Sequence, residues 1–282
     1  MRHNSENWLL KVEGLTKIYG APNNNSIHQT GPQFESNICP ETNAIVACAN
    51  IDFDLYPSEV LGIVGESGSG KSTIVKMLYF DLEHSSGNVL FNKAPYLGKN
   101  ILNESNQSKR AIRNHLMGMV YQNPRDGLNF KFTSGGNIAE KLIMAGHYNV
   151  NNIRNTASHL LEKTEVPVLR LDDIPAHFSG GMQQRVQIAK AIANQPPLLF
   201  LDEVTTGLDV SVQAKVLDLI RELQQEMGVA MIVVSHDLSV IRMLTDRTMV
   251  MKNGRIVEQG LTDQILQDPQ HPYTQLLVSS IL

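Results

Sequence analysis

Residues 65–72 read GESGSGKS and match the pattern G-x-x-x-x-G-K-[ST]. Glycines at this spacing let successive backbone N–H groups curl around an anion, and the positive end of a following helix favours negative charge there. The flanks supply the context that such a loop needs, because an apolar run, Val60–Val64, precedes it and a helical stretch, 72–79, follows it. A structural glycine turn is the alternative, but the bare pattern arises by chance in about one chain per hundred. The stretch therefore predicts a buried strand, a phosphate-binding loop and a helix.

This motif is the P-loop of nucleotide-binding proteins, and it predicts a nucleoside triphosphate and Mg²⁺ as ligands. Lys71 is expected to reach the β- and γ-phosphates, and Ser72 to bind Mg²⁺. The predicted nucleotide-binding residues in this stretch are Gly65, Glu66, Ser67, Gly68, Ser69, Gly70, Lys71, Ser72 and Thr73. A P-loop alone leaves kinases, GTPases, helicases and ATPases open. Asn-Lys-x-Asp, the base-recognition motif expected of a GTPase, is absent from the chain.

A second apolar run, residues 198–201, ends in two carboxylates, Asp202 and Glu203. In a P-loop protein a strand that places Asp202 beside the loop lets it hold Mg²⁺ through water. Glu203 would then lie where an in-line water attacks the γ-phosphate, so it is the predicted general base. Two acidic residues at a strand end are common in isolation, and the P-loop is what favours the catalytic interpretation.

Residues 179–185 read SGGMQQR, and they narrow the kinds of P-loop protein that the chain can be. Two glycines open a helix whose N–H groups, with the Ser179 hydroxyl, form a second anion site. A plain glycine N-cap is the alternative for these residues taken alone. In its order and spacing with the P-loop and the carboxylates, the segment resembles the signature motif of the ABC ATPases, S-G-G-x-Q followed closely by a basic residue. The resemblance covers nearly the whole chain.

The resemblance implies a dimer of two copies with ATP between them. The signature residues of one copy would close over the γ-phosphate held by the P-loop of the other; they are Ser179, Gly180, Gly181, Met182 and Gln183. Asp209, which ends the sequence Gly-Leu-Asp, would link the two active sites across the dimer. At residue 204, valine stands where the family commonly has proline, a change expected to alter local stiffness more than chemistry.

Three further residues lie where the family places functional side chains. Tyr19 would stack on adenine, Gln122 would touch Mg²⁺ and the attacking water, and His236 would contact the γ-phosphate. An ordinary core tyrosine is the alternative for Tyr19, and a structural histidine is the alternative for His236. The predicted catalytic residues are thus Glu203, His236 and Gln122, and the predicted Mg²⁺ ligands are Ser72, Gln122 and Asp202.

The predicted fold class is α/β: an ABC-type P-loop ATPase core with an antiparallel β-subdomain and an inserted helical subdomain that carries the signature. Three apolar runs, Val60–Val64, 198–201 and 229–234, predict buried parallel strands. Alternation over Ile45–Leu55 predicts a strand with one wet face, and Asn253-Gly254 between extended flanks predicts a hairpin. Residues 1–282 are expected to form a single ATP-binding domain, with the helical insertion over about 99–178.

Residues 20–43 are rich in Asn, Pro, Ser and Gly and predict a long surface loop. The loop is longer than most relatives carry there. It is interpreted as a tolerated insertion, with a partner-contact loop as the alternative.

The composition limits the partners, the cysteine chemistry and the location that can be expected of this protein. The net charge of −4 gives no support for a nucleic-acid partner. The two cysteines, Cys39 and Cys48, lie in no metal or redox spacing and are expected to be free thiols of a reducing cytosol. No apolar stretch approaches the ~20 residues of a membrane-spanning helix, and residues 1–7 lack the apolar core of a signal peptide. The sequence therefore predicts a cytoplasmic protein, peripheral to the inner membrane face if it serves an importer.

The segment 268–277, DPQHPYTQLL, resembles two ABC subgroups. One comprises ATPases of oligopeptide, dipeptide and nickel importers, whose partner is a transmembrane permease. The other comprises ATP-binding subunits of bacterial carbon–phosphorus lyase systems, which accompany phosphonate breakdown and would dock on the lyase core subunits.

Three features favour the lyase subgroup. Asp126-Gly127-Leu128 followed by Gly135-Gly136-Asn137-Ile138 replaces the importers' serine-leucine-asparagine-proline, and the sequence LDDIP at 171–175 precedes the signature. The chain also ends about ten residues after His271, where importer ATPases usually continue. The prediction is a lyase-associated ATPase that changes the conformation of the core complex; an importer ATPase is the alternative. A DNA-repair or translation ABC protein is disfavoured by the single nucleotide domain and the lack of a basic extension.

Overall fold

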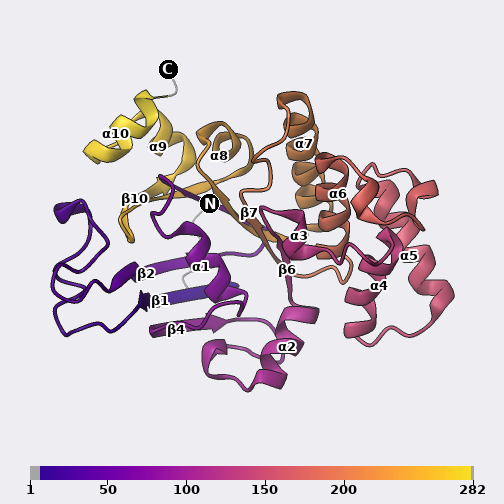
Figure 1. Ribbon diagram of the computed structural model, residues 1–282, viewed down its shortest axis with the longest axis horizontal. Coiled ribbons are helices and arrows are strands. Elements are labelled where there is room, and N and C mark those ends of the chain that lie inside the picture. Colours follow the sequence, from indigo (N-terminus) through magenta and orange to yellow (C-terminus); the bar gives the residue numbers. More distant parts are fainter. Residues whose placement is uncertain (1–6, 281–282) are drawn as a thin grey trace. The chain divides into compact units, whose positions relative to one another are not determined.

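The computed structural model describes residues 7–280, so the predicted lack of a signal peptide falls almost wholly outside the described residues. The chain divides into two compact units, one formed by residues up to Ser105 and from Ile232 onward, the other by residues Asn106–Met231. Figure 1 shows the elements of both. Within residues 7–280, no helix combines the length and apolar character needed to cross a membrane.

The first unit contains an antiparallel sheet in the order β2-β1-β4-β5. Its strands are β1 (Leu10–Tyr19), β2 (Ile45–Leu55), β4 (Ser86–Phe91) and β5 (Lys99–Asn100). Tyr19 pairs with Ile45 at one end of the β1–β2 ladder, and Leu10 pairs with Leu55 at the other. In β2, buried Ile51, Phe53 and Leu55 alternate with less buried neighbours, which confirms the strand predicted from period-two alternation.

The same unit holds four strands of a second sheet in the order β10-β9-β3-β8. They are β3 (Val60–Val64), β8 (Ala230–Ser235), which begins at the unit boundary, β9 (Arg247–Lys252) and β10 (Arg255–Leu261). β3 and β9 are parallel, whereas β9 and β10 are antiparallel. The predicted hairpin at Asn253-Gly254 joins β9 to β10, with positive φ at both residues as a type I′ turn requires. The helices of this unit are α1 (Lys71–Leu78), α8 (Leu238–Leu244), α9 (Thr262–Gln267) and α10 (Pro272–Ser279).

The second unit pairs two parallel strands, β6 (Met117–Val120) and β7 (Leu198–Asp202), both fully buried. Its helices are α2 (Asn106–His115), α3 (Pro124–Gly127), α4 (Ser134–Met144), α5 (Val150–Lys163), α6 (Gly180–Ala191) and α7 (Val210–Met227). Helices α4, α5 and α6 pack against one another (Figure 1). Parallel buried strands with helices, together with the antiparallel sheet, confirm the predicted α/β fold class.

Strands also occur inside the range 99–178 for which the sequence predicts a helical insertion. β5 and β6 lie there, and the first helix after β5 and its short 3₁₀ turn (Ile101–Asn103) is α2. The sequence of β6, MGMV, is only four residues long, and periodicity cannot assign so short an apolar run to a strand or a helix.

The predicted surface loop, 20–43, is held by its own polar side chains. Ser26 and Thr30 are fully buried, and the Thr30 hydroxyl donates to the carbonyl oxygen of Ser26. Arg255 of β10 donates to the carbonyl oxygen of Ile27 at 2.9 Å. Short polar side chains that bond nearby backbone thus give the loop a fixed path without an apolar core. Cys39 and Cys48 are both buried and free, as predicted.

Candidate functional site

The P-loop, residues 65–72, lies between β3 and α1, and its shape depends on glycine. Gly65, Gly68 and Gly70 all have positive φ. A Cβ at Gly65 would lie 2.2 Å from the carbonyl oxygen of Met251, and one at Gly70 would lie 2.1 Å from that of Ala47. Because no side chain fits at these two positions, the backbone can fold tightly and leave its N–H groups for an anion.

Lys71 is the first residue of α1 and is only 4% exposed. Its Nζ donates to the carbonyl oxygens of Gly65 and Glu66, both at 2.8 Å, so the amino group lies within the turn of the loop. The Ser69 hydroxyl is buried and has no hydrogen-bond partner among residues 7–280. The unpartnered Ser69 hydroxyl, the buried lysine and a backbone that excludes a Cβ at Gly65 and Gly70 together fit a phosphate-binding loop.

Two other predicted nucleotide contacts lie in the same unit. Tyr19 ends β1 with 41% of its surface exposed, and Lys17 lies 4.9 Å from the centre of its ring. This exposure excludes an ordinary core tyrosine, and stacking on adenine stays a prediction. His236 is exposed and lies directly after β8, before the N-cap of α8.

In the second unit the structure brings two predicted catalytic residues together. Gln122 Nε2 donates to Glu203 Oε2 at 3.0 Å. Asp202, the last residue of β7, is 4% exposed, whereas Glu203 is half-buried and has left-handed backbone, with φ 48°. That conformation is uncommon for a residue with a side chain. The Glu203 carboxylate thus faces Gln122, the second residue after β6.

Sequence reasoning missed the residues that hold Gln122 in place. The Gln187 side chain accepts from the backbone N–H of Tyr121 at 2.8 Å and donates to the Tyr121 carbonyl oxygen at 3.0 Å. Gln184 also donates to that oxygen, at 3.3 Å. Both glutamines are almost fully buried on α6. Two polar residues three apart on a buried helix face are the signal that could have indicated this role.

The signature residues open α6. Ser179 is the N-cap, and its hydroxyl accepts from the backbone N–H of Met182 at 3.4 Å. Ser179 and Gly180 are exposed, so this helix N-terminus is open to an anion. The Gln183 side chain points instead toward the preceding segment, because its amide donates to the carbonyl oxygens of Pro175 and Phe178. It thereby fixes the segment that leads into the signature.

Asp209 occupies the N-cap position of α7, and its side chain makes no capping bond. Its carbonyl oxygen accepts from the N–H groups of Val212 and Gln213. Along one face of this helix Val216, Leu219 and Leu223 are buried, whereas Val212 is half-buried. The Asp209 carboxylate is therefore left outside the bonding of its own helix.

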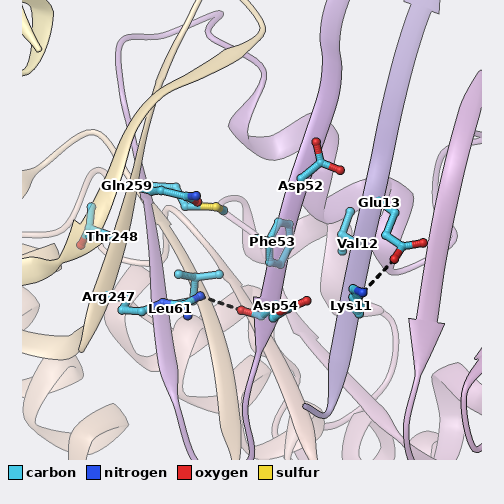
Figure 2. Close-up of a pocket in the computed structure, with 12 residues that line it drawn as sticks. Lys11, Val12, Glu13, Asp52, Phe53, Asp54, Leu61, Arg247, Thr248 and Gln259 are labelled. Atoms are coloured by element: carbon cyan, nitrogen blue, oxygen red, sulfur yellow. Dashed lines mark hydrogen bonds and ion pairs between the residues drawn. The ribbon is translucent and has the colours of Figure 1, made fainter. Parts of the chain in front are cut away.

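A cavity of about 530 Å³ in the first unit contains none of the predicted nucleotide-binding residues (Figure 2). Its charged groups are engaged within its wall: Lys11 pairs with Glu13 at 2.9 Å, and Arg247 donates to the Asp54 carbonyl oxygen. Arg247 also pairs with Glu59 at 3.1 Å. Arg247 thus links β9 to β2, and Lys11 is paired within β1, so both cations act as structural groups.

The predicted Mg²⁺ ligands Ser72 and Asp202 have the side-chain chemistry that this ion prefers. Mg²⁺ prefers oxygen ligands, keeps several waters and is commonly held by one or two protein groups with substrate phosphates. The Ser72 hydroxyl follows Lys71 at the start of α1, and Asp202 offers a carboxylate in the other unit. Both side chains belong to the hard oxygen type that this ion selects.

Comparison with known proteins defines the class. The family model described as "ABC transporter" matches residues 48–206, more than half of the chain. The chain therefore belongs to the ABC transporter family, and it is an ATP-hydrolysing member that binds nucleotide. A second model, "Oligopeptide/dipeptide transporter, C-terminal region", matches residues 257–282.

Individual relatives are similar over most of the chain. A phosphonates utilization ATP-binding protein, PhnK of Escherichia coli (strain K12), is 49% identical over 83% of this chain and 91% of its own length. The oligopeptide transport ATP-binding protein OppF of Lactococcus lactis subsp. lactis (strain IL1403) is 38% identical over 85% of this chain and 73% of its own. Among solved structures, the dimeric post-hydrolysis state of the ATP-binding cassette MJ0796, bound to ADP and Pi, has a TM-score of 0.75 at 26% identity. That match covers 90% of this chain and 98% of the cassette.

Proposed function

We propose that this chain is an ATP-binding and ATP-hydrolysing subunit that serves phosphonate catabolism by docking on a carbon–phosphorus lyase core. The supporting observation is the 49% identity to PhnK, which extends over 91% of that protein's length. Identity to the peptide-transport relative OppF is lower, at 38%, over 73% of its length. The greater likeness favours a role in phosphonate use over a role in peptide import.

In the proposed reaction the P-loop holds the phosphates of ATP through its backbone N–H groups and Lys71, and Tyr19 stacks on the adenine. Glu203 takes a proton from the attacking water, and the bond from Gln122 to Glu203 orients that carboxylate. His236 contacts the γ-phosphate as the terminal bond breaks and ADP and phosphate form. Ser72, Gln122 and Asp202 would hold Mg²⁺, which would neutralise phosphate charge.

The proposed functional form is a dimer. In it the N-terminus of α6, from Ser179 to Gln183, faces the γ-phosphate bound to the P-loop of the second copy, and Asp209 links the two sites. The dimeric cassette among the similar structures supports this arrangement. Closure on ATP and opening after hydrolysis would then transmit a conformational change to the lyase core.

A second candidate is the ATPase of an oligopeptide-type importer, bound to a transmembrane permease. The observation that favours it is the match of residues 257–282 to the C-terminal region of oligopeptide and dipeptide transporters. Tandem affinity purification with identification by mass spectrometry separates the two candidates. Lyase core subunits in the eluate would support the proposal, and a polytopic permease in their place would overturn it.

The nucleotide site itself is tested by Lys71→Ala. Loss of the buried amino group is expected to weaken ATP binding by about 10–100-fold, since charge-assisted bonds to phosphate contribute about 1.5–3 kcal/mol. Isothermal titration with Mg-ATP measures the effect. The control is Lys76→Ala, an exposed lysine on the same helix, which should bind ATP as the wild type does. Unchanged affinity in Lys71→Ala would contradict the assigned role.

A further inference from the structure

The sequence His271-Pro272-Tyr273 forms the start of α10 in a way that fixes the tyrosine. The His271 ring accepts from the backbone N–H of Tyr273 at 3.1 Å and so caps the helix. Pro272 occupies the first helical position, where its missing N–H costs nothing. Glu258 of β10 accepts from the N–H groups of Gln270 and His271, at 2.8 and 3.0 Å. The beginning of the helix is thereby anchored to the sheet.

Tyr273 projects from this anchored start to the P-loop. Its side chain is 5% exposed, and its hydroxyl accepts from the backbone N–H of Glu66 at 3.1 Å. Lys252, at the end of β9, lies 5.0 Å from the centre of the tyrosine ring. Burial raises the pKa of Tyr273 above its ordinary value, so the hydroxyl stays neutral while it accepts this bond.

The Glu66 N–H belongs to the same peptide group as the Gly65 carbonyl, and that carbonyl accepts from Lys71 Nζ at 2.8 Å. In a trans peptide the C=O and N–H point in opposite directions. One peptide group therefore lies between the phosphate-binding lysine on one side and the tyrosine of α10 on the other. Rotation of this peptide group would move the carbonyl oxygen that Lys71 binds, and it would also break the hydrogen bond to Tyr273.

The β9–β10 hairpin adds a second attachment to the same loop. Gly254 N donates to the Ser69 carbonyl oxygen at 3.0 Å, and Gly254 O accepts from Ala49 N at 2.9 Å. The P-loop is thus bonded to the C-terminal part of the chain at Glu66 and at Ser69. Two such points restrict the loop's backbone more than the local glycine-rich sequence could by itself.

We infer that Tyr273 is a positioning residue for the nucleotide site: it holds the Gly65–Glu66 peptide so that Lys71 and the following N–H groups are preset for phosphate. The inference rests on ATP binding at the P-loop. It adds a residue that lies 207 positions from Glu66 in sequence and couples the C-terminal region to the phosphate loop.

The test is Tyr273→Phe, which removes the hydroxyl and keeps the ring. The Kd and KM for Mg-ATP are expected to rise about three- to tenfold, the equivalent of one lost hydrogen bond. The kcat at saturating ATP should change less, because no reacting group is removed. Exchange of the Glu66 amide hydrogen, followed by NMR or mass spectrometry, should become faster. Tyr148→Phe is the matched control, since Tyr148 is 75% exposed in the other unit.

Wild-type Kd, KM and Glu66 exchange in a folded Tyr273→Phe variant would overturn the inference, even if the melting temperature fell. If that variant does not fold, Lys252→Gln is the second test, because it keeps the hydroxyl and removes the cation from the ring. A rise in Kd of about twofold supports the role, and no rise overturns it. Wild-type protein that fails to bind ATP would refute the nucleotide site itself and this inference with it.

Discussion

The two glycine-containing segments at helix N-termini, the P-loop and the signature, are built differently. In the P-loop Gly65 and Gly70 have positive φ and leave no room for a Cβ beside neighbouring backbone, and Lys71 is buried. The signature glycines, Gly180 and Gly181, have ordinary helical φ, and Ser179 and Gly180 are exposed. One loop is held from several elements of its own unit, while the other presents an open helix end.

We propose that the two segments serve different steps of the ATPase cycle. A loop already held in shape can bind phosphate without reorganisation, which favours affinity. An exposed helix N-terminus makes no such enclosure alone and needs a second surface to complete an anion site. We therefore expect P-loop substitutions to impair ATP binding and signature substitutions to impair turnover with binding intact.

The largest expected effect is that of Glu203→Gln, which tests whether the two segments meet. Loss of the general base should lower kcat by about 10²–10⁴-fold while ATP still binds. The variant should accumulate as an ATP-bound dimer, measured by light scattering with and without Mg-ATP. Glu222→Gln, an exposed residue on α7, is the control and should keep wild-type turnover. Surviving hydrolysis in Glu203→Gln would show that another group acts as base.

Gly70→Ala should have the next largest effect and acts on the enclosed segment. The added Cβ would lie 2.1 Å from the Ala47 carbonyl oxygen at φ 103°, so stability should fall by about 2–5 kcal/mol. Gly68→Ala is the matched control: φ is 82° and nothing lies within 4 Å, so only about 1–2 kcal/mol of backbone strain is expected. Thermal and urea unfolding measure both. Equal losses would mean that the contact with Ala47 contributes nothing.

Gly180→Ala should have the smallest effect and acts on the open segment. The new Cβ would meet only Leu208, at 3.6 Å, so stability should change by less than about 1 kcal/mol. ATP affinity should stay the same, while the ATPase rate falls about 10–100-fold because a methyl group obstructs the helix end. Gly181→Ala contrasts with it, since its Cβ would lie 2.5 Å from Val212 and should cost stability. Weakened ATP affinity in Gly180→Ala would contradict the proposal that the signature affects turnover and not ATP binding.

The sequence predicted what depends on local pattern. Strand β3, the P-loop and α1 are contiguous, and the alternation of β2 and the Asn253-Gly254 turn are likewise local signals. Strand β6 was not predicted, because four apolar residues carry no period. The bond between Tyr273 and Glu66 and the bonds from Gln187 to Tyr121 join residues 207 and 66 positions apart. Neither bond has a local signature, and glutamate is not a residue type that signals left-handed backbone such as that of Glu203.

The link from α10 to the P-loop has a thermodynamic consequence. Leu276, which is 66% exposed, lies on the same short helix as Tyr273. A protein that binds this helix through Leu276 would therefore be able to displace the tyrosine. Linkage is reciprocal: if such a protein changes ATP affinity by some factor, ATP changes the affinity of that protein by the same factor. Binding of ATP at the P-loop would then change the apparent dissociation constant of a protein bound to the outer face of α10. Binding of that protein would change the apparent dissociation constant of ATP in the same way.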